Sequence, residues 1–187
     1  SSPQNQSLLS MLNIKYIFSS FKLPNFKLIY QTTATEKNIP VYVYENPEAM
    51  PRIYFANDVK LVASKDAFDE LLKVKNFKDL SLIECQKDCP APSSKLQAPS
   101  SITIEEFHTQ FVKIKTKANE GAWLIYSDAN LPTWEAYIDN QLAPIYTVNY
   151  LFKSVFVPKG EREVIFKYPN LWGQFKYAFK NFILGRQ

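Results

Sequence analysis

The chain has 187 residues, which is enough for one domain, or for one domain with a smaller lobe. Its hydrophobic fraction of 46% and its aromatic fraction of 15% are typical of a globular protein and exclude a disordered one. The net charge is only +4 and the lysines are scattered, so the basic stripe of a nucleic-acid-binding module is missing and we expect no nucleic-acid partner.

The first part of the chain predicts a smaller mixed α/β lobe over residues 1–85. A helix is expected from Gln6 to Ile14, where leucines recur at helical spacing, and a second from Lys65 to Lys73, with Ser64 as its cap. The apolar stripe of the second helix, which we expect to pack in the core, is Phe68, Leu71 and Leu72. Segments rich in β-branched and aromatic residues predict strands at Lys15–Phe18, Leu28–Gln31, Val41–Tyr44, Arg52–Phe55 and Val59–Val62.

A change of composition at residues 86–101 predicts a loop or linker rich in proline and serine. After it, residues 102–169 alternate short strand-like runs with turn signals, which predicts an antiparallel, jelly-roll-like β-sandwich. The protein as a whole is therefore expected to be mainly β, or α+β overall. The expected strands are Ile102–Glu105, Phe111–Lys117, Trp123–Ser127, Trp134–Asp139, Ile145–Val148, Ser154–Val157 and Glu163–Tyr168.

Residues 170–187 form an amphipathic tail that combines aromatic and basic side chains. Two alternatives follow from this pattern: the tail docks on the domain, or it lies at a membrane surface with its aromatic rings in the interface. The chain contains no run of about 18 apolar residues, so no segment is predicted to span a bilayer.

The two cysteines, Cys85 and Cys89, lie close together in the run ECQKDCP. This spacing, followed by Pro90, favours a local disulfide, which would imply an oxidising compartment. Two free thiols are the alternative. A metal site would need two further ligands in a chain with a single histidine, so we expect no metal.

The sequence carries no recognisable catalytic motif, and its 4 glycines argue against a phosphate-binding loop. Glu105 and Glu106 are adjacent, so on a strand they point to opposite faces and cannot act as an acid/base pair. His108 has no triad partner in its neighbourhood and is interpreted as a surface or edge residue. We therefore expect neither a catalytic residue nor a cofactor.

The aromatic side chains of the second half offer one binding hypothesis. Exposed rings on a sandwich face can hold sugar rings, although buried aromatic side chains are commoner. The candidates for carbohydrate binding are Trp123, Tyr126, Trp134 and Tyr137.

Several short runs stand out as motifs. Residues 8–17 read LLSMLNIKYI, 43–52 read VYENPEAMPR, 132–140 read PTWEAYIDN, 149–160 read NYLFKSVFVPKG, and 164–168 read VIFKY. In this order, and over most of the chain, they resemble the C-terminal part of YfhO-like bacterial membrane proteins. Thr133 and Asn140 stand where that family often has glycine, which alters the chemistry of two turns.

The resemblance implies a domain on the extracytoplasmic face of a bacterial membrane, attached to a polytopic glycosyltransferase of the GT-C type that uses a lipid-linked sugar donor. The catalytic aspartate of such enzymes lies in the membrane part, so no catalytic residue carries over to this chain. The implied partners are that membrane-embedded part and a glycan or cell-envelope polymer, which the domain would position. The alternatives are a free-standing carbohydrate-binding module and a purely structural or assembly domain.

Overall fold

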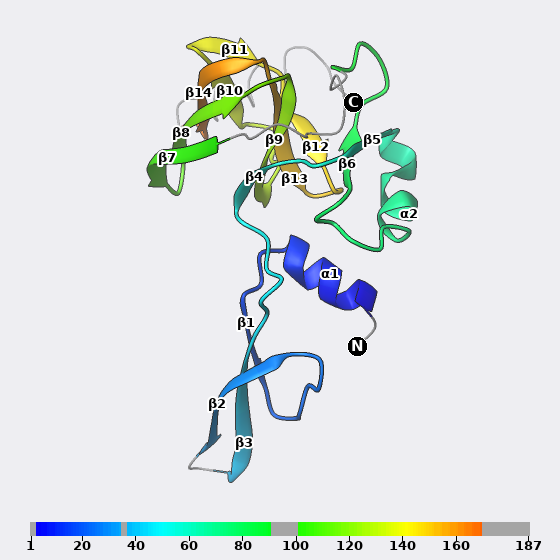
Figure 1. The fold of residues 1–187 in the computed structure, drawn as a ribbon, viewed down its shortest axis with the longest axis vertical. Coiled ribbons are helices and arrows are strands. Elements are labelled where there is room, and N and C mark those ends of the chain that lie inside the picture. Colours follow the sequence, from blue (N-terminus) through cyan, green and yellow to red (C-terminus); the bar gives the residue numbers. More distant parts are fainter. Residues whose placement is uncertain (1–2, 35–36, 91–100, 170–187) are drawn as a thin grey trace, which may run out of the picture.

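The structure is a computed structural model that describes residues 3–34, 37–90 and 101–169. The protein is mainly β, with three sheets and few helices among these residues, which confirms the predicted fold class. Figure 1 shows two of the sheets stacked in a rounded body, while the third extends away from it.

The rounded body contains a five-stranded and a six-stranded sheet. The first is antiparallel throughout, with the order β11-β10-β14-β8-β7, and the second has the order β4-β9-β13-β12-β6-β5, with β5 and β6 parallel. The five strands are β7 (Ser101–His108), β8 (Phe111–Ala118), β10 (Glu135–Ile138), β11 (Gln141–Ala143) and β14 (Gly160–Lys167). The six are β4 (Ile53–Phe55), β5 (Val59–Val62), β6 (Ser81–Glu84), β9 (Ala122–Ala129), β12 (Tyr146–Val148) and β13 (Phe152–Val157).

The two sheets pack face to face around a shared hydrophobic core, as the predicted sandwich requires. Strand β8 shows why the sequence folds this way, because its valine, isoleucine and threonine point inward while Lys113, Lys115 and Lys117 point outward. The buried residues of this core are Ile53, Val112, Ile114, Leu124, Tyr126, Ala136, Val155, Val157, Val164 and Phe166.

A third layer covers the other face of the six-stranded sheet. It consists of the end of α1 (Pro3–Met11), a 3₁₀ turn (Ser64–Asp66), α2 (Ala67–Leu71) and the loop that follows. The expectation for the second helix is wrong in two respects. The α-helix has only five residues, and of its predicted stripe only Leu71 is buried, because so short a helix presents little more than one turn to the core. The Phe68 ring instead packs against the Tyr150 ring, with 5.4 Å between their centres.

Segments from both sides of residue 86 build the six-stranded sheet. Strands β4, β5 and β6 precede that residue, yet β4 hydrogen-bonds to β9, and β6 hydrogen-bonds to β12. Strand β6 was not among the expected strands, because its run SLIE has only two apolar residues, which are adjacent and show no alternation. Strand β11, which has three residues, was missed as well.

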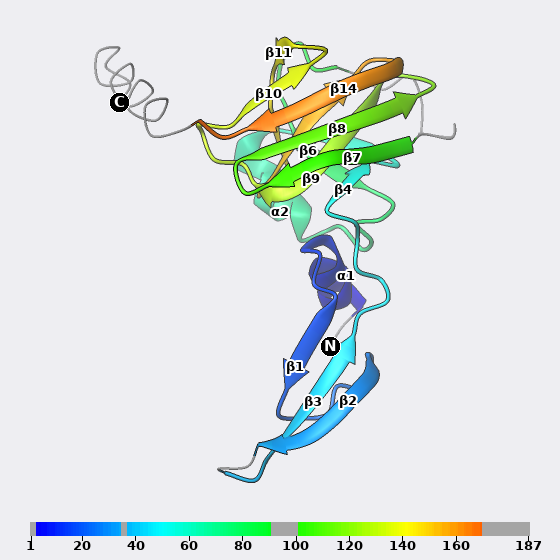
Figure 2. The same ribbon diagram turned by 90° about the vertical axis from the view of Figure 1, so that its left-hand side faces the viewer.

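The third sheet is antiparallel and has the order β1-β3-β2. Its strands are β1 (Tyr16–Ser19), β2 (Lys27–Ala34) and β3 (Ile39–Glu45). Figure 2 shows it projecting from the sandwich beyond α1. A small core of its own, centred on Phe26, Tyr42 and Tyr44, stabilises one of its faces.

Candidate functional site

The four aromatic residues expected to bind carbohydrate do not share one exposed surface, and two of them are buried. Trp123 and Tyr126 are both buried in β9, with 1% and 2% of their surface exposed. They point to opposite faces of that strand: Trp123 packs in the core under the helices, and Tyr126 packs between the two sheets. The Trp123 ring is held edge-on by Tyr146 at 4.9 Å and by Phe156 at 5.5 Å, so it has no surface to offer a sugar.

Of the four, the structure brings together only Tyr126 and Trp134, whose ring centres are 6.2 Å apart. Trp134 is half-buried and also packs against Tyr168. Tyr137 lies in β10, where Ala136 faces the sandwich core and Tyr137 therefore faces outward. Its hydroxyl donates a 2.9 Å hydrogen bond to Glu135, and this carboxylate raises the pKa of Tyr137.

A buried lysine lies beside the Tyr126–Trp134 pair. Lys153 is opposite Tyr126 in the pairing of β13 with β9, and its side chain is 0% exposed. Its Nζ atom lies 4.0 Å from the centre of the Trp134 ring and 4.6 Å from that of Tyr126. Both distances are within the range of cation–π interactions, so two ring faces surround the ammonium.

An irregularity in β9 places an acidic residue beside this lysine. Phe152 pairs with Ala129, whereas the next residue, Lys153, pairs with Tyr126, so Ser127 and Asp128 form a bulge in β9. The Asp128 carboxylate lies 3.8 Å from Lys153 Nζ, which is an ion pair but too long for a hydrogen bond.

Burial dominates the ionisation of this cluster. It lowers the pKa of the Lys153 ammonium to about 8, while the Asp128 charge acts in the opposite direction. Burial also raises the pKa of the Tyr126 hydroxyl well above its usual range, and the charge of Asp128 adds to that effect.

A cleft of about 510 Å³ opens next to the cluster, between the start of β4, the β7–β8 turn and β9. It is lined by Arg52, Phe107, His108, Thr109, Tyr126 and Asp128. The backbone N–H of Ser127 donates a 2.8 Å hydrogen bond to the carbonyl of Arg52, which fixes Arg52 beside the bulge. The Arg52 guanidinium lies 5.9 Å from the centre of the Phe107 ring, which is itself 45% exposed.

The lining combines a half-exposed aromatic ring with a guanidinium, a carboxylate and an imidazole. Such a set can hold a small polyhydroxylated ligand, since the ring contacts apolar C–H groups while the charged side chains hydrogen-bond to hydroxyls. Sequence reasoning missed Arg52, Phe107 and Asp128 as a group. It placed His108 at an edge, and the side chain is indeed 70% exposed at the rim of the cleft. No signal in the sequence relates these residues, because they come from three separate segments.

Another cavity, of about 360 Å³, lies on the outer face of the five-stranded sheet. Its lining includes Lys115, Lys117 and Glu161, whose charges are already engaged: Lys117 pairs with Glu161 at 2.9 Å and Lys115 with Glu105 at 2.5 Å. Because these charged groups already form ion pairs and the lining includes no aromatic side chain, this cavity is the weaker candidate for a ligand site.

Cys85 and Cys89 form a disulfide directly after β6, with 5.9 Å between their Cα atoms. In the part of the chain that the structure describes, no three histidine, cysteine or acidic side chains lie close enough together to hold a metal ion. None of the described helices combines the length and the apolar character needed to cross a membrane.

Comparison of the chain with family models, with curated proteins and with solved structures finds no match.

Proposed function

We propose that this chain is a non-catalytic, extracytoplasmic domain of a YfhO-like membrane glycosyltransferase, and that its cleft positions part of a glycan acceptor. The observation that carries the binding proposal is the convergence of Phe107, Arg52 and Asp128 on one cleft. The link to a membrane glycosyltransferase is supported by the resemblance of the motif runs. The Cys85–Cys89 disulfide supports a location outside the cytoplasm, where disulfides persist.

In this proposal each side chain of the cleft has a distinct task. The exposed face of Phe107 stacks on the C–H face of a sugar ring, and Arg52 and Asp128 bind its hydroxyls as donor and acceptor. Lys153 does not line the cleft, and it acts by holding the Asp128 carboxylate in place from behind. Tyr126 forms the floor of the cleft. Its buried ring contacts the Phe107 ring edge-on, with 6.2 Å between the ring centres, and so holds Phe107 in position.

A glycan-array screen of the whole chain tests the binding proposal. We expect Phe107→Ala and Asp128→Asn each to weaken the binding of any recognised glycan by about tenfold or more, as for side chains at the centre of a site. Phe68→Ala is the matched control, because Phe68 is exposed to a similar extent, 50% against 45%, but lies on α2. Loss of binding in the control as well, or no glycan bound by the unaltered chain, would favour a structural or assembly domain instead.

A free-standing carbohydrate-binding module would give the same array result. Mass-spectrometric peptide mapping of the native protein from cells distinguishes the two. We expect peptides from membrane-spanning segments on the same polypeptide, and their absence together with a released, soluble product would support the module.

A further inference from the structure

The protruding sheet has one face that nothing in the described structure covers. Residues paired across antiparallel strands point to the same side of a sheet. The pairing therefore places Phe18, Val43 and Tyr30 in one row on this face, with Tyr16, Glu45 and Lys27 in the next row. Ile17 and Tyr44 point to the other side, into the small core.

This open face presents large apolar side chains to solvent. Phe18 is 73% exposed, Tyr30 59% and Tyr16 50%. Phe21, in the loop that joins β1 to β2, is 66% exposed. An exposed cluster of this kind marks a contact surface, because isolated apolar side chains are common on proteins but a row of aromatic side chains is not.

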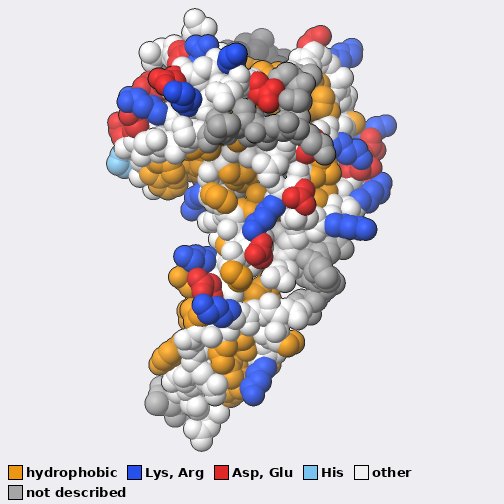
Figure 3. All heavy atoms as spheres, in the orientation of Figure 1, with side chains coloured by type: hydrophobic (Ala, Val, Ile, Leu, Met, Phe, Trp, Pro, Cys, Tyr) orange, Lys and Arg blue, Asp and Glu red, His pale blue; other side chains and the backbone are white. Residues whose placement is uncertain are grey.

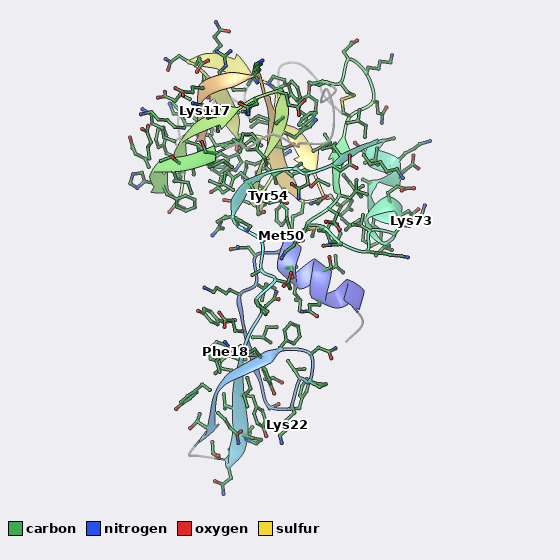
Figure 4. The ribbon with its side chains drawn as sticks, viewed as in Figure 1. Phe18, Lys22, Met50, Tyr54, Lys73 and Lys117 are labelled. Atoms are coloured by element: carbon green, nitrogen blue, oxygen red, sulfur yellow. A yellow bond between two sulfur atoms is a disulfide. The ribbon has the colours of Figure 1, made fainter. Side chains whose placement is uncertain are left out.

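The segment that forms the protruding sheet carries a surplus of lysines. Residues 15–45 carry four lysines against two glutamates, and Lys15, Lys22 and Lys27 are all exposed. Lys27 forms an ion pair with Glu45 at 3.7 Å, and the charges of these two side chains cancel. The net charge of residues 15–45 is therefore still positive. Figure 3 shows hydrophobic side chains and lysines together on the protruding part, and Figure 4 places Phe18 and Lys22 there.

We propose that this face, the aromatic face of the β1-β3-β2 sheet, docks on an anionic phospholipid bilayer. Phenylalanine and tyrosine side chains enter the interfacial region of a membrane, and flanking lysines are attracted to anionic headgroups. A second copy of the chain is a poorer occupant, since two such faces would bring like charges together. The proposal shares no residue with the glycan cleft, so each can fail without the other.

Flotation of the whole chain with lipid vesicles tests the proposal. We expect binding to vesicles of phosphatidylcholine with phosphatidylglycerol, little binding to phosphatidylcholine alone, and a loss of binding as salt rises. The double variant Phe18→Ser/Tyr30→Ser should lower the bound fraction by about tenfold or more, because both rings leave the interface. Lys15→Gln and Lys22→Gln should each weaken binding about fivefold.

Leu142→Ser is the matched control, because Leu142 is 71% exposed on β11, away from the protruding sheet, and we expect this variant to float like the unaltered chain. The altered positions in the protruding sheet and in β11 are exposed, so circular dichroism should report an unchanged fold for these variants. Lack of flotation of the unaltered chain overturns the proposal. So does flotation that survives Phe18→Ser/Tyr30→Ser but is lost in Lys176→Gln/Lys180→Gln, which would place the membrane contact in the tail. Concentration-dependent dimers that the Phe18 and Tyr30 changes abolish, with flotation unaltered, would assign the face to a second copy.

Discussion

At the scale of single residues, Lys153 is fully buried although its side chain carries a charge. A lysine is seldom fully buried, because removal of its charge from water is costly. Here two ring faces and Asp128 partly replace water, but the ammonium donates no hydrogen bond in the described structure. The charge therefore opposes folding, and in the proposed function Lys153 acts on the cleft through Asp128.

Replacement of this lysine by methionine should raise the free energy of unfolding at pH 7 by about 2–3 kcal/mol, since the apolar stem stays and the buried charge is removed. The unaltered protein should also gain stability as pH rises from about 8 to about 10.5. In that window the folded Lys153, with its pKa of about 8, has lost its proton while the unfolded chain still holds it. Urea denaturation at several pH values checks both expectations.

The methionine variant should lack this gain at alkaline pH. Lys115→Met, at an exposed position of β8, serves as the control and should change stability by no more than about 0.5 kcal/mol. A Lys153→Met variant that is strongly destabilised at every pH would show that the ammonium stabilises the fold instead.

At the scale of elements, the turn between β12 and β13 holds three strands in place. Asn149 is 1% exposed and has a φ of 49°, in the left-handed region that asparagine tolerates. Its backbone N–H donates to the carbonyl of Leu82, and its side-chain oxygen accepts from the N–H of Leu82, both at 2.8 Å. One turn residue therefore completes the pairing of β12 with β6.

Asn149→Ala should lower the free energy of unfolding by about 2–4 kcal/mol, because it leaves the buried Leu82 N–H unpaired and strains the backbone. Asn140→Ala separates the two causes, since Asn140 has a φ of 65° but an exposed side chain. That variant should lose only about 1–2 kcal/mol. Urea denaturation measures both, and equal losses would mean that the hydrogen bond to Leu82 contributes little.

At the scale of the whole molecule, the protruding sheet joins the sandwich through a small polar junction. The Asn46 side chain is buried there and donates to the carbonyl of Ile14 at 3.0 Å and to the Ser10 hydroxyl at 3.2 Å. Its oxygen accepts from the N–H of Glu48, and the N–H of Met50 donates to the carbonyl of Ser10 at 3.0 Å. These hydrogen bonds connect α1 and the segment before β1 with the segment between β3 and β4.

Loss of this junction in Asn46→Ala should loosen the protruding sheet and leave the sandwich intact. We expect amide hydrogen exchange to accelerate in residues 15–45 by about tenfold, with strands β8, β9 and β14 unchanged, because separate cores stabilise the two parts. Mass-detected exchange checks this, and Asn57→Ala, at an exposed position of the sandwich, is the control. Equal acceleration in both parts would show that they unfold as one unit.

The fold class and most strands were predictable because their signals are local. Apolar and polar side chains alternate along Phe111–Lys117 and around Ala136. This alternation indicates a strand with one buried and one solvent-exposed face, whichever strand it pairs with. Strand β6 was not predictable in this way because its run SLIE has only two apolar residues, which are adjacent and do not alternate. The exposure of Phe68 was not predictable either, because it depends on how few residues of α2 pack on the core.

The sequence by itself determined the β-rich class and the strands whose side chains alternate, since both depend on neighbours within a few residues. Only the tertiary structure decided the cleft and the aromatic face. Arg52, Phe107 and Asp128 meet because β9 pairs with a distant β4 and because Tyr126 of β9 contacts Phe107 of β7. The bulge that places Asp128 beside Lys153 exists only in the pairing of β9 with β13. Contacts of this kind depend on the register of distant strands and leave no periodic trace in the chain.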